Sequence, residues 1–233
     1  MPKKPENIAE VLNKLAGLYD NLTDEQKREF KANLSVQDYK KNEIIYREGD
    51  QPLHLFCLLS GKVKVYKDGV GGRSQTMRLY KPVEYFGYRA YMAGERFLTT
   101  AAAFERTTVA RIPLELLAKF ISNNNALALY IIQSLAKLLG KSDERTVNLT
   151  QKHIRARLAE SLLFLRDSYG LEEDGCTLSI YLSREDLANL SNMTTSNAIR
   201  TLSGFASEKI VAIDGKKIKL INEAELERIS RMG

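Results

Sequence analysis

The sequence has little cysteine and little histidine: Cys57, Cys176, His54 and His153 are the only such residues among 233. Two cysteines exclude a disulfide framework and a four-thiolate iron–sulfur or zinc site within one chain. Two histidines far apart in the sequence do not supply the ligand cluster of a cupin-like metalloenzyme. The HExxH, GxxxxGK(S/T) and GxSxG signatures are absent as well. We therefore expect a binding protein with no catalytic and no metal site.

Long apolar segments are also missing. No run approaches the roughly 20 residues that a membrane span needs. The N-terminus leads into an amphipathic stretch instead of the apolar core of a signal peptide, so we expect a cytoplasmic protein without membrane contact. The hydrophobic fraction of 44% is enough for ordinary buried cores. The length suggests one or two domains of about 100–200 residues each.

The first half of the chain changes from a helical to a strand-like pattern. Residues 7–20 place apolar side chains at helical spacing, and Thr23 with Gln26 forms the pattern of a capping box. From about Asn42 to Pro113 the pattern is short strands separated by turns at residues 48–50, 60–61 and 68–72. Such spacing predicts an all-β barrel or roll.

A long helix is predicted after this β region. Residues 114–120 form a short amphipathic helix, and Asn123 to Asn125 mark a break. The segment from Ala126 to about Leu149 then shows a seam spaced alternately by three and four residues: Ala128, Ile131, Leu135, Leu138, Ser142, Arg145 and Leu149. This spacing is typical of a coiled coil, and it predicts a dimer held by the apolar half, Ala128, Ile131, Leu135 and Leu138. The alternative is a helix that packs on its own domain.

The C-terminal part has a mixed pattern. Residues 152–168 form another amphipathic helix, and residues 178–182 are predicted to form a strand. Two short helices and a hairpin follow. The hairpin strands at residues 210–213 and 217–220 flank Asp214-Gly215, a strong turn signal because both turn residues must tolerate positive φ.

The two short helices form the pattern that carries function. Ser183 can cap the first helix, with Asp186 three residues later, and Thr194 can cap the second. Asn192 suits the tight turn between them because asparagine tolerates a left-handed backbone. The predicted buried residues are Leu187, Ala188, Leu190, Ala198, Ile199 and Leu202, and the predicted exposed residues are Thr195, Ser196, Asn197 and Arg200. This is a helix-turn-helix, and the hairpin makes it a winged helix. The alternative is a helical hairpin in an accessory domain of an enzyme.

Net charge gives no support for DNA binding, whereas local charge does. Residues 151–233 hold 12 Lys plus Arg and 12 Asp plus Glu, so the whole excess of +6 lies in residues 1–150. Phosphate contacts need cations at specific places. Basic residues gather around the motif, and we expect DNA contacts from Arg184, Thr194, Thr195, Ser196, Asn197, Arg200, Lys216 and Lys217, with Lys219 close by.

These patterns together resemble the catabolite-activator/fumarate-nitrate-regulator (CRP/FNR) superfamily of bacterial transcription factors. The resemblance rests on EGDQPLHLFCLLSGKVKVY at residues 48–66, the long helix from Ala126, and SREDLANLSNMTTSNAIRTLSGFASEKIV at residues 183–211. It implies an α+β fold: an N-terminal double-stranded β-roll that binds an effector, a long dimerisation helix, and a C-terminal winged helix. The implied domains are residues 1–122, 123–150 and 151–233. The implied partners are a second copy of the chain, a near-palindromic double-stranded DNA operator and RNA polymerase.

The sequence departs from the family's cyclic-nucleotide cassette. That cassette carries a Glu for the ribose and, about ten residues later, an Arg for the cyclic phosphate. Here the matching segments are Gly87-Tyr88-Arg89-Ala90 and Phe97-Leu98-Thr99-Thr100-Ala101, so Tyr88 and Leu98 stand at those two places. Burying a phosphate without its cation is costly, so we expect no ordinary cyclic AMP binding. The pocket implied by the resemblance also includes Ser142 and Asp143 of the long helix.

Other effectors remain open at this point. Arg89 and Arg96 could serve a different anion, or they could be solvated surface residues. A haem sensor would need an axial ligand such as His54, Cys57 or His153, but we expect the first two to be packing residues and His153 to begin a helix without a ligand. No cofactor is expected, only an unidentified small-molecule effector. A cyclic-nucleotide-binding regulatory subunit without DNA binding is disfavoured by the winged helix.

The recognition helix also departs from the family, which commonly shows an Arg-Glu-x-x-x-Arg face. Thr195 and Ser196 take the first two places, and only Arg200 matches the last. Arginine pairs with guanine through two hydrogen bonds, whereas hydroxyl groups read either base of a pair. We therefore expect an operator that differs from the family's best-known consensus and keeps at least one guanine per half-site.

Overall fold

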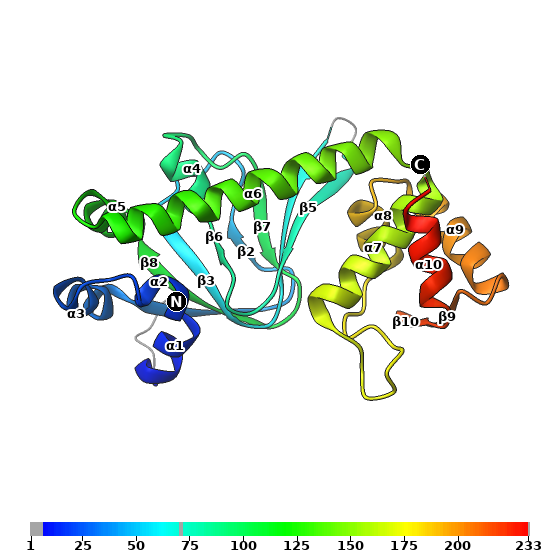
Figure 1. The fold of residues 1–233 in the computed structure, drawn as a ribbon, viewed down its shortest axis with the longest axis horizontal. Helices are drawn as coiled ribbons and strands as arrows, with labels where there is room; N and C mark the ends of the chain where they lie inside the picture. The colour runs from blue at the N-terminus through cyan, green and yellow to red at the C-terminus, as the bar shows by residue number, and fades with distance from the viewer. Residues whose placement is uncertain (1–6, 70–71, 233) are drawn as a thin grey trace. The chain divides into compact units, whose positions relative to one another are not determined.

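The protein is described by a computed structural model that covers residues 7–69 and 72–232 (Figure 1). The described residues divide into two compact units. The N-terminal unit holds residues 7–67 and 77–140, and the C-terminal unit holds residues 68–69, 72–76 and 141–232. Nowhere in these ranges is a helix both long enough and apolar enough to cross a membrane.

Short helices open the N-terminal unit, as predicted. They are α1 (Ile8–Lys14), α2 (Ala16–Tyr19) and α3 (Asp24–Asn33). The capping box is confirmed, because the Thr23 hydroxyl accepts from the Gln26 backbone N–H and the Gln26 side chain accepts from the Thr23 N–H at 3.0 Å. Gln26 also donates to the Phe120 carbonyl at 3.3 Å, which ties α3 to a helix that follows the β region.

The β region is a roll of two antiparallel sheets (Figure 1). One sheet has the order β1-β8-β3-β6 and the other β2-β7-β4-β5. The strands are β1 (Ser35–Tyr39), β2 (Ile44–Tyr46), β3 (His54–Ser60), β4 (Val63–Asp68), β5 (Ser74–Tyr80), β6 (Tyr85–Phe86), β7 (Thr100–Ala103) and β8 (Thr107–Pro113).

Two details of the roll differ from or go beyond the sequence analysis. The roll begins at Ser35, earlier than the predicted start at Asn42. β1 was missed because its buried residues, Val36 and Tyr39, are three positions apart and do not alternate. The predicted turns at Gly49 and Gly61 are present, both with positive φ. Val70 and Gly71 of the third turn, like the start of the N-terminal stretch at residues 1–6, lie outside the described residues.

The long helix packs on the outside of the roll. It is α6 (Asn125–Gln151), and it follows α4 (Tyr88–Met92) and α5 (Leu114–Ser122). Leu127 and Ile131 are buried in a core cluster with residues of β3 and β8, and Leu135 and Leu138 pack against the same cluster. Ile131 of the predicted seam therefore faces its own protomer, whereas the dimer contact predicted for Ala128, Leu135 and Leu138 stays a prediction. The exposed apolar residues of this half are Leu129, Ile132 and Leu139.

The C-terminal unit is a helical cluster with a small hairpin (Figure 1). Its helices are α7 (Ile154–Tyr169), α8 (Arg184–Leu190), α9 (Thr195–Ser207) and α10 (Glu223–Ser230), and its strands are β9 (Val211–Asp214) and β10 (Lys217–Leu220). The hairpin is confirmed, but its turn is one residue later than predicted. Asp214 pairs with Lys217, so the turn residues are Gly215 and Lys216.

The strand predicted at residues 178–182 does not form. Only isolated bridges are present there, from Leu178 to Leu171 and from Thr177 to Lys219. Leu178, Ile180 and Leu182 are all buried, which explains the alternating pattern. The apolar side chains of this segment alternate because every second one is buried against the helical cluster. No neighbouring strand extends the pairing beyond the two bridges, so a β-strand does not form.

A polar cluster on the sheet of β1, β8 and β3 contains one of the two histidines. Arg111 donates to the Gln37 side chain at 2.6 Å, and its other terminal nitrogen lies 3.2 Å from Nδ1 of His54. Burial first, and then the Arg111 charge, hold the pKa of His54 below its usual 6.5. His54 is therefore neutral at neutral pH and can accept from Arg111.

We expect this pair to make the roll less stable in mild acid. An unfolded chain binds a proton at His54 near pH 6.5, whereas the folded chain binds it only at lower pH. The contribution of the pair to the free energy of unfolding is therefore present above pH 6.5 and is lost as the pH falls through the folded pKa. Urea unfolding of wild type and His54→Gln from pH 7.5 to 5 measures this. A wild-type fall no steeper than that of the variant would contradict it.

Candidate nucleic-acid interface and effector site

The helix-turn-helix is formed as the sequence predicts. The Ser183 hydroxyl accepts from the Asp186 N–H at 3.0 Å and caps α8, and the Thr194 hydroxyl accepts from the Asn197 N–H at 3.2 Å and caps α9. Asn192 in the turn has a φ of 50°. Ser191 donates to the Ser161 hydroxyl at 2.8 Å in a buried contact, which fixes the turn to α7. The caps thus define the first residues of α8 and α9, and the turn between these two helices sets the angle at which they meet.

The two faces of α9 are clearly separated. Ala198, Leu202 and Phe205 are buried, whereas Thr195, Ser196 and Arg200 are exposed, as predicted. The prediction for Ile199 is wrong, because its side chain is 46% exposed. Residues 198, 202 and 205 form one stripe of an α-helix, and residue 199 lies about 100° away from it. An exposed isoleucine beside Ser196 and Arg200 adds an apolar group to the polar face.

Asn197 and Arg200 form one unit on this face. Arg200 donates to the Asn197 side-chain oxygen at 2.8 Å, and Asn197 is half-buried rather than fully exposed. The bond holds the Arg200 guanidinium along the helix surface. It leaves further N–H donors of Arg200 for another acceptor, since a guanidinium has five.

The basic residues around the hairpin differ in what they contact. Arg184 donates to the Gly215 carbonyl at 2.8 Å and so fixes the hairpin turn to α8. Lys217 lies 3.7 Å from a Glu172 oxygen and 5.5 Å from the centre of the Tyr181 ring. Lys216 is exposed in the turn, and it has no ion pair with the residues at 7–69 or 72–232. Of the predicted contacts, Lys216 is therefore the cation best placed to reach a phosphate.

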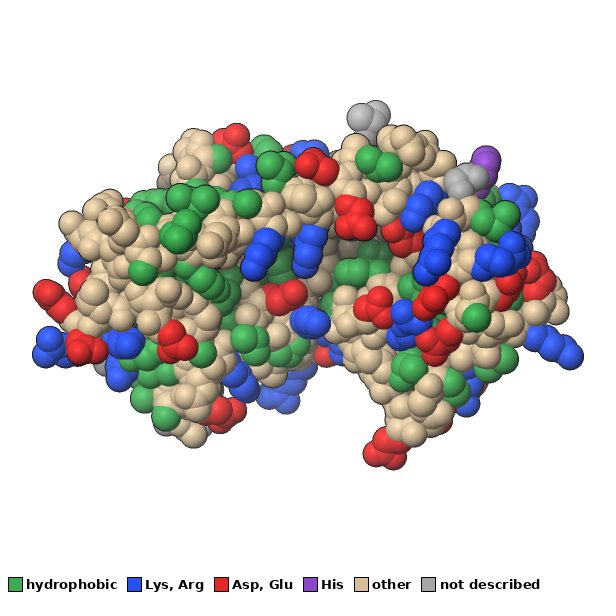
Figure 2. Space-filling model, in the orientation of Figure 1, with side chains coloured by type: hydrophobic (Ala, Val, Ile, Leu, Met, Phe, Trp, Pro, Cys, Tyr) green, Lys and Arg blue, Asp and Glu red, His purple; other side chains and the backbone are tan. Residues whose placement is uncertain are grey.

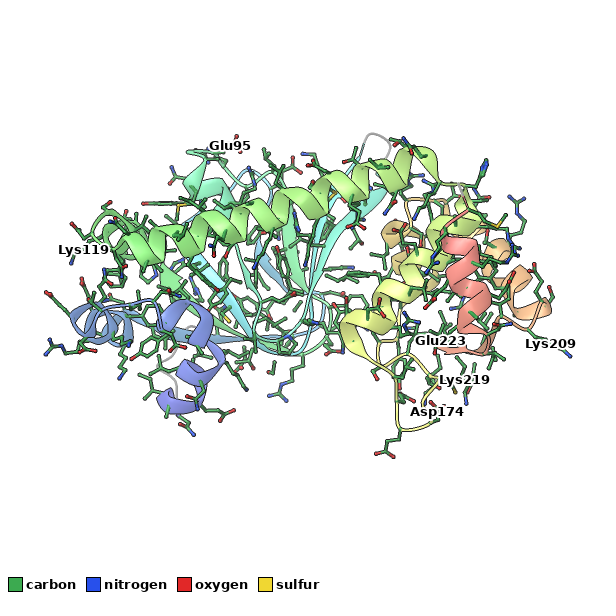
Figure 3. All side chains as sticks on the ribbon, viewed as in Figure 1. Glu95, Lys119, Asp174, Lys209, Lys219 and Glu223 are labelled. Carbon is green, nitrogen blue, oxygen red and sulfur yellow. The ribbon has the colours of Figure 1, made fainter. Side chains whose placement is uncertain are left out.

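An ion pair holds the loop before α8 against the hairpin. Lys219 lies 3.2 Å from Asp174, and the two side chains lie next to each other in Figure 3. The Asp174 carboxylate also accepts from the Thr177 hydroxyl at 2.6 Å and from the Thr177 N–H at 2.8 Å. These hydrogen bonds, with that of Cys176 and the Lys219 charge, hold the pKa of Asp174 well below its usual range. Lys219 is thus neutralised locally.

A hollow lies beside the recognition helix in the same unit. It has a volume of about 610 Å³ and is lined by the first turn of α7 and by residues of α9 and α10, among them Arg155, Arg200 and Arg228. Glu208 binds Arg155 through two contacts of 2.7 and 2.8 Å, and Glu225 likewise binds Arg228. Figure 2 shows blue and red side chains intermixed over this unit, in agreement with its balanced charge.

The predicted effector residues of the roll do not form one polar site. Gly87 has a φ of 88°, and a Cβ there would lie 2.6 Å from the Phe56 ring, so only glycine fits. Tyr88 and Ala90 are buried, whereas Leu98 is 52% exposed. Thr100 accepts from the Glu48 N–H at 3.1 Å, and Thr99 hydrogen-bonds Tyr46.

The two arginines suggested for an anion are engaged elsewhere. Arg89 pairs with Glu95 at 3.1 Å on the surface, and Arg96 donates to the Gly49 carbonyl at 2.8 Å. Ser142 and Asp143 are exposed on the part of α6 that groups with the C-terminal unit. None of these residues provides a buried cation in the roll.

The candidate haem ligands have other surroundings. His54 lies against the Arg111 cation. Cys57 is fully buried, and burial raises the pKa of its thiol to about 12, so it is not a thiolate at neutral pH. His153 precedes α7 and is exposed. No three His, Cys, Asp or Glu side chains gather as metal ligands in the part of the chain that the structure describes.

Arg78 on β5 is not among the site residues predicted from the sequence. Tyr80, two residues later, stacks on Phe86 inside the roll, with ring centres 5.1 Å apart. Since side chains alternate along a strand, Arg78 lies on the same face as Tyr80. The sequence did contain a signal, because residues 76, 78 and 80 alternate along the strand and share one face. An arginine in such a series normally indicates the solvent-exposed face, so the position was not singled out.

Comparison with known proteins agrees with this architecture. The cyclic nucleotide-binding domain family matches residues 36–124, and the Crp-like helix-turn-helix domain family matches residues 156–229. The chain is 24% identical to the global nitrogen regulator of Synechococcus elongatus over 85% of this chain and 90% of that protein. It is 20% identical to the CRP-like cAMP-activated global transcriptional regulator of Mycobacterium tuberculosis, over 93% and 97%.

Solved structures share the fold. A putative transcriptional regulator of the CRP/FNR family from Eubacterium rectale aligns with a TM-score of 0.79 at 22% identity, covering 92% of this chain and 97% of that one. FixK2 from Bradyrhizobium japonicum aligns with a TM-score of 0.77 at 22% identity, covering 86% and 98%. Roll, long helix and capped helix-turn-helix occur here in the same order, and the relatives are transcriptional regulators rather than enzymes. The chain belongs to the CRP/FNR family of DNA-binding transcriptional regulators.

Proposed function

We propose that this regulator acts as a homodimer on a near-palindromic operator and that its roll responds to an effector other than cyclic AMP. The observation that carries the proposal is the exposed first half of α9, with Thr195, Ser196 and Arg200 on one capped helix. In a helix-turn-helix this helix enters the major groove. Small hydroxyl side chains allow close approach to base edges, and Arg200 reads a guanine.

Ile199 adds to this reading. Its exposed side chain lies beside the polar residues of α9, where an apolar group can contact a thymine methyl. Arg184, Thr194, Asn197 and Lys217 act chiefly by placing the helix and the hairpin, since each is engaged in a contact within the unit. Lys216 contacts the DNA backbone.

Replacing Arg200 tests the recognition surface. We expect Arg200→Ala to lose about 1–3 kcal/mol of binding on the best site and to relax one base position, because the bidentate contact is lost. The measurement is fluorescence anisotropy with a duplex that the wild type selects from a random pool. Arg231→Ala is the control, since Arg231 is an exposed arginine of the same unit outside the motif. Equal affinity and selectivity of Arg200→Ala and wild type would refute the assignment.

The proposed dimer surface is the exposed stripe of α6. Leu129, Ile132 and Leu139 are 55%, 62% and 63% exposed and are separated by three and seven residues. This is the spacing of a coiled-coil seam. The opposite side of the same helix is already covered by the roll, so a second copy is the occupant that buries this stripe by symmetry.

The residues at the two ligand-binding positions of the cassette support an effector other than cyclic AMP. Tyr88 and Leu98 offer neither the carboxylate nor the cation that the family's cyclic-nucleotide site requires. Burial raises the pKa of Tyr88 to about 12, so this side chain is neutral. The dimer also contacts RNA polymerase when bound at a promoter, a partner that we extend to this chain from the family.

A further inference from the structure

The interior of the roll is filled by a stack of rings. Tyr46 stacks on Phe97 with centres 3.7 Å apart and planes at 13°, and Phe56 lies 6.0 Å from Tyr46. Phe86 lies 5.1 Å from both Phe56 and Tyr80. Rings at 3.7 Å are in direct contact. A nucleotide base therefore has no slot between Tyr46 and Phe97.

One arginine next to a tyrosine of this stack has no ion-pair partner among the described residues. Arg78 lies on the same face of β5 as Tyr80 and is half-buried. It has no hydrogen bond and no ion pair with any residue at 7–69 or 72–232. A partly desolvated guanidinium normally pairs with an acceptor, because leaving its donors unmet is costly. The structure thus holds an arginine whose acceptor is missing from the described chain.

Phenol groups surround this cation. The Arg78 charge acts on the hydroxyls of Tyr46, Tyr80 and Tyr88, so all three lie within its electrostatic reach, and the Arg89 charge acts on Tyr46 as well. Burial is the larger effect at each of them and raises the pKa, to about 12 at Tyr46 and Tyr88. All three are therefore neutral O–H groups near neutral pH. A guanidinium with neutral hydroxyls favours an oxygen anion.

Two acidic side chains of the roll make contacts with other groups. Glu84, which also acts on Tyr80, accepts from the Lys81 N–H at 2.9 Å. Glu95 pairs with Arg89 at 3.1 Å on the surface, where both are about half exposed (Figure 3 labels Glu95). Neither forms an ion pair with Arg78, so its guanidinium N–H groups have no carboxylate acceptor among the described residues.

We propose that Arg78 is the anion-binding cation of the roll and that its ligand is a small oxyanion, a carboxylate or a phosphate, rather than a nucleotide. The proposal rests on the proposed function, since this ligand would be the effector. The small size follows from the ring stack, and the oxyanion follows from the arginine and the hydroxyls of Tyr46, Tyr80 and Tyr88.

The test is calorimetric titration of the full chain with inorganic phosphate and, separately, with acetate, in a chloride buffer of low ionic strength. We expect one of the two to bind at millimolar concentration or below, and this identifies the phosphate or the carboxylate as the recognised group. Arg78→Met should weaken that binding at least about tenfold, because a charge-assisted contact is lost. Arg106→Met is the matched control and should bind as the wild type does, because Arg106 is an exposed arginine of the same unit whose charge does not act on the three tyrosines.

A charge-retaining variant and a parallel measurement of operator affinity make the result unambiguous. Arg78→Lys retains the charge and should keep binding within about tenfold, which separates loss of charge from loss of folding. Binding of neither anion, equal binding by Arg78→Met, or equal loss in Arg106→Met would overturn the proposal. Operator affinity is measured in parallel with and without each anion. Its absence in wild type under all these conditions would contradict the proposed function, whereas the anion titrations judge Arg78 alone.

Discussion

Replacing Ile132 by aspartate should convert the protein from dimer to monomer. Ile132 is 62% exposed at the centre of the stripe formed with Leu129 and Leu139. Burying one such side chain contributes about 1.5–3 kcal/mol, and a twofold-symmetric interface loses it twice. The dimer dissociation constant should therefore rise by more than about 100-fold. Two carboxylates forced into one apolar seam add to this loss.

Sedimentation velocity at micromolar concentration measures this effect. The control is Leu53→Asp, because Leu53 is equally apolar, is 59% exposed, and lies in the same unit away from α6. The control should sediment as the wild-type dimer. A monomeric wild type, or an Ile132→Asp variant that sediments as a dimer, would refute the interface.

Operator binding should fall together with dimerisation. A monomer carries one recognition helix and can occupy only one half-site, whereas a dimer occupies two half-sites about 34–36 Å apart. A single winged helix makes too few contacts for tight binding at physiological salt. Ile132→Asp should therefore lose operator affinity although every residue of α9 is unchanged. A full-affinity monomer would show that recognition does not need the pair.

The dimer helix shows what the sequence can and cannot decide. Two stripes of α6 are apolar, one through Ile131 and Leu135 and one through Leu129 and Ile132. They are offset by one position in the sequence, about 100° around the helix, and both have heptad spacing. Only the packing of β3 and β8 reveals that the first stripe covers the roll. The sequence of a helix with two apolar stripes therefore does not specify which stripe covers the roll and which stripe is left for a partner.

Local rules worked where the chemistry is local. The caps at Thr23, Ser183 and Thr194 and the left-handed Asn192 involve residues within four positions, and all are present. By contrast, Arg78 depends on contacts between strands that are far apart in sequence. Its role depends on Tyr46 and Tyr88, which are 32 and 10 positions away in the sequence, and no local pattern places these residues together.

Cyclic AMP should bind no more tightly than millimolar and should leave operator affinity unchanged. The family's site uses a carboxylate for the ribose and an arginine for the cyclic phosphate, and Tyr88 and Leu98 supply neither. Each missing charge-assisted bond costs about 1.5–3 kcal/mol, or one to two decades of affinity. The loss of both takes a micromolar site to millimolar or weaker. Arg78 does not replace them, because the contact of Tyr46 with Phe97 excludes the base.

Calorimetric titration with cyclic AMP, paired with operator binding at saturating nucleotide, tests this expectation. Leu98→Arg is an informative variant, because residue 98 is 52% exposed and can accept the larger side chain without disturbing the core. It restores the cation but neither the carboxylate nor a slot for the base, so its binding of cyclic AMP should stay well short of micromolar. A low-micromolar dissociation constant in the wild type, with a matching rise in operator affinity, would contradict the argument. It would mean that another cation serves the cyclic phosphate, and the first candidate is Arg89 of the cassette after release from Glu95.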